Sequence, residues 1–213
     1  MYKKGGIYMQ KTNSKDVINR FKRVEQYFKK VSGGTAEDIH KIIHEDYDRA
    51  IKRAELMASI DRKSYDQPYV LLIPHQLEKG RKVSYRLDLL ANGAQTLLYD
   101  QTLISVIFFG HETFYYYQSH IDHQTGEISL DLSGEFGYFD VIHVVTRLGY
   151  DNPQKPKYET LDLEIGLSDG AVVPIHLRSY RLQSDFKPAI FISEDELKII
   201  DRLKKKVRES RQG

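Results

Sequence analysis

The sequence contains no cysteine, no tryptophan and no long apolar run. Without cysteine the chain can form no disulfide and can supply no thiol nucleophile or thiolate metal ligand, which fits a reducing cytoplasm. Its longest apolar run, Leu103–Phe109, is far shorter than the roughly 20 residues of a membrane-spanning helix. The N-terminus also lacks the long apolar segment of a signal peptide. Together these absences predict a cytoplasmic protein without a transmembrane segment.

Motifs that bind cofactors or activate nucleophiles are missing as well. The sequence has no phosphate-binding glycine loop, no Rossmann fingerprint and no nucleophile elbow. We therefore expect no cofactor. The 213 residues are 40% hydrophobic and 29% charged, a composition typical of a soluble globular protein with a sizeable core.

The net charge of +2 conceals an uneven distribution. Residues 1–63 carry a net charge of +6, whereas residues 64–192 carry a net charge of −6. Basic helices docked on an acidic, β-rich body would account for this asymmetry without a polyanionic partner.

Residues 14–32 are predicted to form an amphipathic helix, because apolar residues recur every three or four positions. A second helix is expected from Thr35 to about residue 61, and two glycines separate the helices. Such a link is typical of an αα-hairpin. We therefore divide the chain into residues 1–63, a leader and helical hairpin, and residues 64–213, an antiparallel β domain with a C-terminal helix. Codons for Lys-Gly-Gly before Met9 could encode a ribosome-binding sequence, so Met9 rather than Met1 is a candidate start in a bacterial gene.

From Pro68 onward the hydrophobic pattern has a period of two, which indicates β-strands. Short connections rich in turn residues indicate an antiparallel meander. An amphipathic helix follows, with Ser193 and Glu196 in the spacing of a capping box. The predicted fold class is α+β: an N-terminal αα-hairpin, an antiparallel β-barrel or sandwich, and a C-terminal amphipathic helix. The expected strands are residues 69–74, 82–90, 95–100, 102–109, 112–121, 127–132, 138–147, 158–167 and 171–180.

The segment Tyr138-Phe139-Asp140-Val141-Ile142-His143-Val144, with the hairpin of Leu161–Leu167 and Val173–Leu177 around an Asp-Gly turn, resembles bacterial pleckstrin-homology-like (PH-like) domains. The resemblance covers roughly residues 94–209. It implies strands followed by one amphipathic helix, and a binding scaffold rather than an enzyme. The family commonly has a tryptophan in its C-terminal helix, which this chain lacks.

Two ligand classes are weighed against that resemblance. Phosphoinositide recognition needs clustered Lys and Arg in the loops between the early strands. Here those loops carry His111 and residues 123–126 in an acidic body, which argues against phosphoinositides and favours a protein or peptide. A homodimer through the N-terminal hairpin is a further candidate assembly.

The most unusual stretch is Phe114-Tyr115-Tyr116-Tyr117. On a strand, Tyr115 and Tyr117 share one face. Tyrosine is favoured at interfaces, because it combines a large apolar area with a polar tip. Packing in the core is the simpler explanation of the stretch, and the candidate binding surface is Tyr115, Tyr117, His120 and His123.

Two alternative functions draw on other residues. His40 and His44, one helical turn apart, could present two imidazoles to a metal, and together with His120 and His123 they support a metal-dependent enzyme that uses histidine and carboxylate groups. A boundary histidine and a solvated one explain the first pair more simply. Nucleic-acid binding through basic helices rests on Lys204, Lys205 and Lys206 together with Arg208 and Arg211, but cations are also expected in the last turns of a helix. We therefore favour a non-enzymatic protein- or peptide-binding module and leave these alternatives open.

Overall fold

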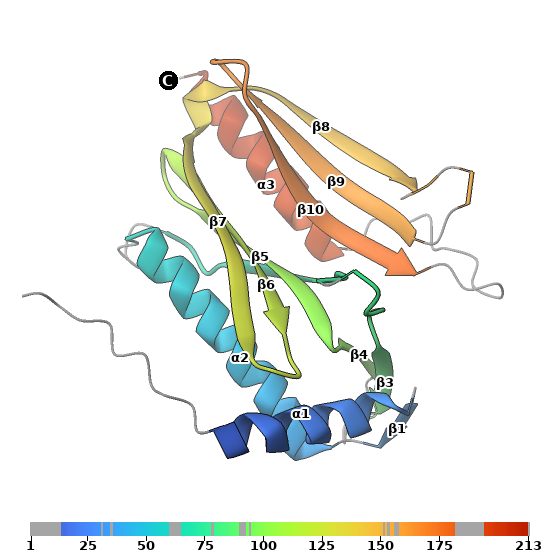
Figure 1. Cartoon of the computed structure of the whole chain (residues 1–213). Helices are drawn as coiled ribbons and strands as arrows, with labels where there is room; N and C mark the ends of the chain where they lie inside the picture. The colour runs from blue at the N-terminus through green and yellow to red at the C-terminus, as the bar shows by residue number, and fades with distance from the viewer. Residues whose placement is uncertain are drawn as a thin grey trace, which may run out of the picture.

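The computed structural model describes residues 14–30, 32–34, 36–59, 65–77, 79–89, 93, 95–150, 152, 154–155, 158–181 and 194–212. Over these residues the fold is α+β, with three α-helices and ten strands in three sheets (Figure 1). The proposed start at Met9 and the capping residue Ser193 lie outside the described residues.

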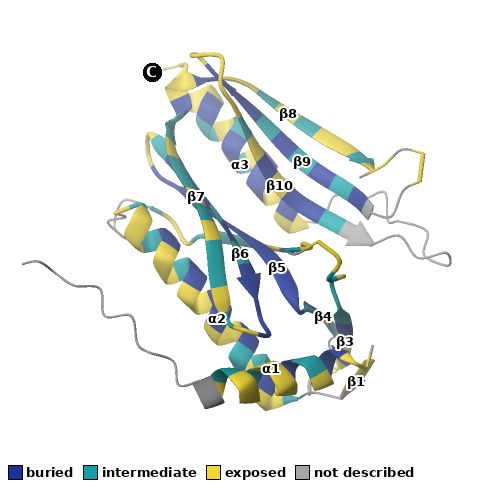
Figure 2. Ribbon diagram, viewed as in Figure 1, coloured by how far each residue is buried: buried dark blue, intermediate teal, exposed yellow. Residues whose placement is uncertain are grey.

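The middle of the molecule is a four-stranded antiparallel sheet in the order β2-β5-β6-β7. Its strands are β2 (Tyr69–Pro74), β5 (Gln101–Phe109), β6 (Thr113–Asp122) and β7 (Glu127–Gly137). β5 is buried along its whole length (Figure 2), as expected for a strand that is apolar on both faces. Because alternate side chains point to opposite faces of a strand, this sheet contributes to two separate hydrophobic cores.

One core lies between the sheet and the N-terminal helices α1 (Ser14–Phe28) and α2 (Glu37–Met57). α1 lies across one end of α2, and α2 runs along the face of the sheet (Figure 1). The buried side chains of this core on β5 and β6 are Ile104, Val106, Phe108, Tyr115, Tyr117 and Ile121. The helices and the sheet therefore share one core.

The other core lies between the opposite face of that sheet, a second sheet and α3 (Glu194–Ser210). The second sheet has the order β10-β9-β8, from β8 (Val141–Tyr150), β9 (Tyr158–Leu167) and β10 (Val172–Arg181). The two sheets come together at β2 and β10. Over the described residues neither sheet closes into a barrel, so the layout is sandwich-like.

A small third sheet has the order β1-β3-β4, from β1 (Ser32–Gly34), β3 (Tyr85–Leu89) and β4 (Gln95–Tyr99). β1 is formed by the segment between α1 and α2, and it pairs in parallel with β3. The sequence prediction of a plain glycine link missed this strand, because three residues with two glycines carry no periodic signal.

The nine predicted strands are confirmed, with ends that shift by three residues or fewer except in β7, which extends five residues beyond the predicted end at residue 132. Two further details were wrong. Residues 138–140 form a 3₁₀ turn, η1 (Tyr138–Asp140), instead of the start of a strand. Plain alternation along the strand would place His143 on the buried face of Val141. His143 is exposed instead, because an irregularity between Val141 and His143 shifts the pairing with β9 and reverses the faces.

No helix among the described residues is both long enough and apolar enough to cross a membrane.

Candidate functional site

The tyrosines of β6 lie inside the molecule. Tyr115 is 4% exposed and Tyr117 is 0% exposed, and both belong to the core beneath α1 and α2. The Tyr117 hydroxyl donates a hydrogen bond of 2.5 Å to Asp131 on β7. The expectation that these two residues form a binding surface is therefore wrong for this structure, because the N-terminal helices cover them.

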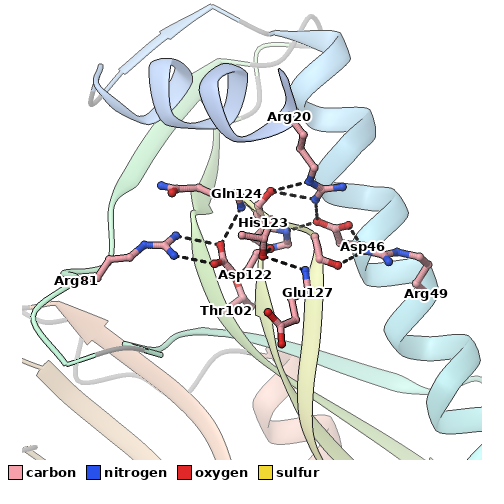
Figure 3. Close-up of polar contacts among 11 residues, drawn as sticks. Arg20, Asp46, Arg49, Arg81, Thr102, Asp122, His123, Gln124 and Glu127 are labelled. Atoms are coloured by element: carbon pink, nitrogen blue, oxygen red, sulfur yellow. Dashed lines mark hydrogen bonds and ion pairs between the residues drawn. The ribbon is translucent and has the colours of Figure 1, made fainter. Parts of the chain in front are cut away.

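His123, in the turn between β6 and β7, is fully buried against α2 (Figure 3). Its Nδ1 lies 2.7 Å from Asp46 Oδ2, and its Nε2 lies 3.2 Å from Thr102 Oγ1. Burial alone would raise the pKa of Asp46, but the hydrogen bond from His123 and the charge of Arg20 hold that pKa below its ordinary value. Asp46 is thus an ionised carboxylate, and since a carboxylate only accepts hydrogen bonds, Nδ1 carries the proton.

Arginines from both helices hold the backbone of the same turn (Figure 3). Arg20 of α1 donates to the His123 carbonyl at 3.1 and 3.0 Å and also pairs with Asp46. Arg49 of α2 donates to Asp46 at 2.6 Å and to the Gly126 carbonyl at 2.7 Å. We call Arg20, Asp46, Arg49 and His123 the turn clamp. The uneven charge distribution along the chain predicts that basic helices dock on the sheet. The turn clamp contributes to this docking.

The Asp46–His123–Thr102 line has the order of groups found in a hydroxyl-activating triad. All three residues are 0% exposed, so no substrate can reach the hydroxyl while the helices are docked. The arrangement holds the helices on the sheet, and it gives the chain no hydrolytic site.

The proposed metal pair does not form a site. His40 Nε2 lies 2.8 Å from Asp88 on β3 and 3.1 Å from the Tyr27 hydroxyl, whereas His44 is exposed. His40 therefore joins α2 to the small sheet. Among the residues that the structure describes, no three histidine or acidic side chains are placed to hold a metal ion.

His120 and His123 do not share a partner either. The ring of His120 lies against that of His75, at the end of β2, with 4.6 Å between centroids. Loss of solvent contact lowers the pKa of both rings, and the neighbouring charge of His176 on β10 lowers that of His75 further. A hydrogen bond to Asp162 raises the pKa of His176. No sequence pattern indicates this cluster, since His75 follows β2 while His120 and His176 lie on β6 and β10, which belong to different sheets.

The contact between His75 and His120 predicts a loss of stability in acid. The pKa values of His75 and His120 are lower in the folded chain than the value of 6.5 for a free histidine, so between those values the unfolded chain binds more protons. Stability contributed by the pair is present above pH 6.5 and is lost as the pH falls through the folded pKa values. His176 has a raised pKa, so its effect on stability has the opposite dependence on pH. Its stabilising contribution is lost as the pH rises.

Replacing His75 and His120 together by asparagine should therefore flatten the fall in unfolding free energy below pH 6.5, as measured by urea denaturation at several pH values. His44→Asn, at an exposed position of α2, is the control. An unchanged slope in the double variant would contradict the assignment.

β8 is an edge strand, and within the described part of the chain it pairs with β9 alone. Side chains on both of its faces are exposed and apolar, and its only Lys or Arg, Arg147, pairs with Glu164 of β9 at 3.0 Å. The exposed apolar side chains of β8 are Ile142, Val145, Leu148 and Tyr150.

β7, an edge strand of the middle sheet, has a different character. It carries Glu127, Asp131 and Glu135, and Leu130 has a φ of 54°, which interrupts the regular strand. Charges and irregularities of this kind are how proteins prevent an edge from pairing with another chain. β8 has far fewer charged side chains and irregularities over residues 143–150.

Gly149 on β8 is not explained by the fold. The other glycines whose surroundings are defined either have a positive φ or would bring an added Cβ within 3.0 Å of a neighbouring atom. Gly149 has neither property, and an added Cβ would meet nothing within 4 Å. A strand glycine often marks a place where another backbone approaches closely.

Two surface cavities, of about 640 and 550 Å³, lie along α3. They share Lys206 and Glu209, and charged side chains of both signs line each of them. No set of buried polar groups converges on either cavity in the described part of the chain, so neither has the character of a small-molecule site.

Comparison of the chain with protein-family models, with curated proteins and with solved structures gives no match. Its function is therefore argued from its own residues.

Proposed function

We propose that the chain is a cytoplasmic, non-enzymatic, PH-like module that binds a protein or peptide partner, and that the partner adds a strand to the free edge of β8. The observation that carries the proposal is this edge, with exposed apolar side chains over most of its length. In strand addition the backbone groups of the edge supply affinity, and the alternating side chains supply specificity.

The order of the elements supports the PH-like interpretation. Four strands of the middle sheet are followed by the three strands of the second sheet and then by α3. The β3–β4 hairpin is inserted between the first two strands of the middle sheet, and the N-terminal helices are an addition before it. The order begins at β2, upstream of the range in which the sequence resembles the family.

We propose β8 as the binding surface, instead of the strand β6 that contains Tyr115 and Tyr117. Tyr115, Tyr117 and His123 are buried beneath the N-terminal helices, whereas Val145 and Leu148 are 42% and 43% exposed. A homodimer through the N-terminal hairpin stays a prediction. The inner face of the hairpin packs on the sheet, so a second copy would have to use the outer residues Ile18, Phe21, Leu56 and Met57, which are exposed.

Asparagine at Val145 and Leu148 should weaken partner binding by about tenfold or more, because two exposed apolar contacts are removed without adding charge. The wild-type protein would be used to select ten-residue peptides from a random library, and the affinities of the selected peptides would then be measured by fluorescence anisotropy.

Leu132→Asn, at a 58% exposed position of β7, is the matched control and should bind as the wild type does. Circular dichroism and urea denaturation would establish that all three proteins fold. Equal affinity of the selected peptides for wild type and double variant, or no enrichment of any peptide, would refute the proposed role of β8.

A further inference from the structure

We propose that the segment that pairs with β8 is acidic, and that the C-terminal half of α3 recognises its carboxylates. This inference rests on the proposed function. It identifies the chemistry of the partner, which an apolar strand edge alone does not.

Two cations of α3 and one just after its end lie along one flank of the helix. Lys204, Arg208 and Arg211 are separated by four and three residues, and residues at these spacings are neighbours on a helix surface. Residues 204–211 contain five Lys or Arg and one acidic residue, Glu209. The flank is therefore strongly positive.

Arg211, just after α3, fixes this flank beside β8. Its Nη2 donates to the carbonyl oxygens of Val141 and Ile142 at 2.6 and 2.9 Å. Both carbonyls belong to the start of the edge strand. A chain that pairs with the start of β8 would thus lie beside Arg211, and Arg208 and Lys204 follow on the same flank, about one and two helical turns away.

The charges of this flank are not neutralised within the described chain. Neither Lys204 nor Arg208 forms an ion pair with a described residue, whereas cations elsewhere on α3 do. Lys198 pairs with Asp195 at 3.0 Å, and Arg202 pairs with Asp66 of the segment before β2. Within the part of the chain that the structure describes, Arg208 donates only to the carbonyl oxygen of Lys204, so both cations can accept a partner's carboxylates as counter-ions.

The spacing of the cations matches an extended peptide. Lys204 and Arg211 are seven residues apart, which is roughly 10 Å along the helix axis. An extended chain covers that distance in about three residues, and side chains two residues apart lie on the same side. Two or three acidic residues at alternate positions would face the flank while the peptide backbone pairs with β8. A lipid surface or a nucleic acid would meet the charges but offers no backbone to the strand edge, so a peptide is favoured.

The test uses three fluorescein-labelled peptides of ten residues. Each alternates valine or threonine with a second residue, which is glutamate, glutamine or lysine. We expect the glutamate peptide to bind the wild-type protein about tenfold more tightly than the glutamine peptide at low salt, and the difference to shrink in about 0.5 M salt. The double variant Lys204→Glu/Arg208→Glu should reverse the preference toward the lysine peptide.

Lys198→Glu/Lys206→Glu is the matched control, because it makes the same change of charge around the cavity that contains Tyr69. It should keep the preference for glutamate. Equal binding of the glutamate and glutamine peptides, lost in Val145→Asn/Leu148→Asn, would overturn the acidic partner and leave the role of β8 standing. Binding of no peptide would overturn both, and binding of the glutamate peptide that the β8 variant does not weaken would show a charge contact away from the strand edge, which also overturns the inference.

Discussion

Replacing Asp46 with asparagine is expected to lower the free energy of unfolding by about 3 kcal/mol, because it removes one partner from a buried charge network. The Asp46 side chain is 0% exposed and contacts His123, Arg20 and Arg49. Asparagine keeps only one acceptor oxygen, so either His123 and Arg20, which share Oδ2, or Arg49, which uses Oδ1, would face an N–H group in a buried position. The guanidinium of Arg20 also loses its counter-ion. Urea denaturation followed by circular dichroism measures the change.

Asp48→Asn is the matched control, since Asp48 is an exposed carboxylate on the same helix, and its loss should change stability by less than about 0.5 kcal/mol. The Arg49 side chain is 51% exposed, so Arg49→Gln should cost less than about 1 kcal/mol. If Asp46→Asn proved as mild as the control, the turn clamp would not be what holds the helices on the sheet.

Replacing Arg178 with methionine is expected to cost about 3–5 kcal/mol, because it leaves buried carboxylates without their cation. Arg178 of β10 is 3.2 Å from Glu159 of β9 and 3.5 Å from Glu196 of α3. All three side chains are at most 7% exposed. Since this network joins the first turn of α3 to the second sheet, hydrogen exchange should detect weaker protection in α3.

The triple variant Arg178→Met/Glu159→Gln/Glu196→Gln should recover most of that loss, because it removes the buried charges together. Arg147→Met breaks a pair with Glu164 in which the arginine side chain is 64% exposed, and it should cost less than about 1 kcal/mol. A triple variant no more stable than Arg178→Met would mean that packing, and not unpaired charge, causes the loss.

Hydrophobic periodicity predicted most of the fold. The alternation of apolar and polar residues predicted the observed ends of both β2 and β9. Each of these strands has turn residues on both sides and one regular face. The same reasoning failed at His143, where an irregular pairing reverses the faces, and at Tyr138, which is buried in a 3₁₀ turn. Such irregularities depend on the neighbouring strand and leave no period in the sequence.

The candidate site was less predictable. The spacing of Tyr115 and Tyr117 correctly indicated a shared face, but whether that face meets solvent depends on where α1 and α2 dock, which no local pattern encodes. The sequence likewise gave no reason to pair Asp46 with His123, 77 residues later. The sequence of β8 is equally uninformative, because a run of apolar residues with a single charged side chain is the pattern of a buried strand such as β5, and only the sheet order shows that β8 is an edge.

The complete burial of β5 has a consequence for synthesis of the chain on the ribosome. α1 and α2 emerge before β5 and can cover Ile104 and Val106 at once, whereas Ile107 and Phe109 on the other face are covered by β8–β10 and α3, which are all made later. Until α3 emerges, the nascent chain exposes an apolar sheet face of the kind that promotes aggregation. The chain is therefore most prone to aggregation between the translation of β6 and the translation of α3.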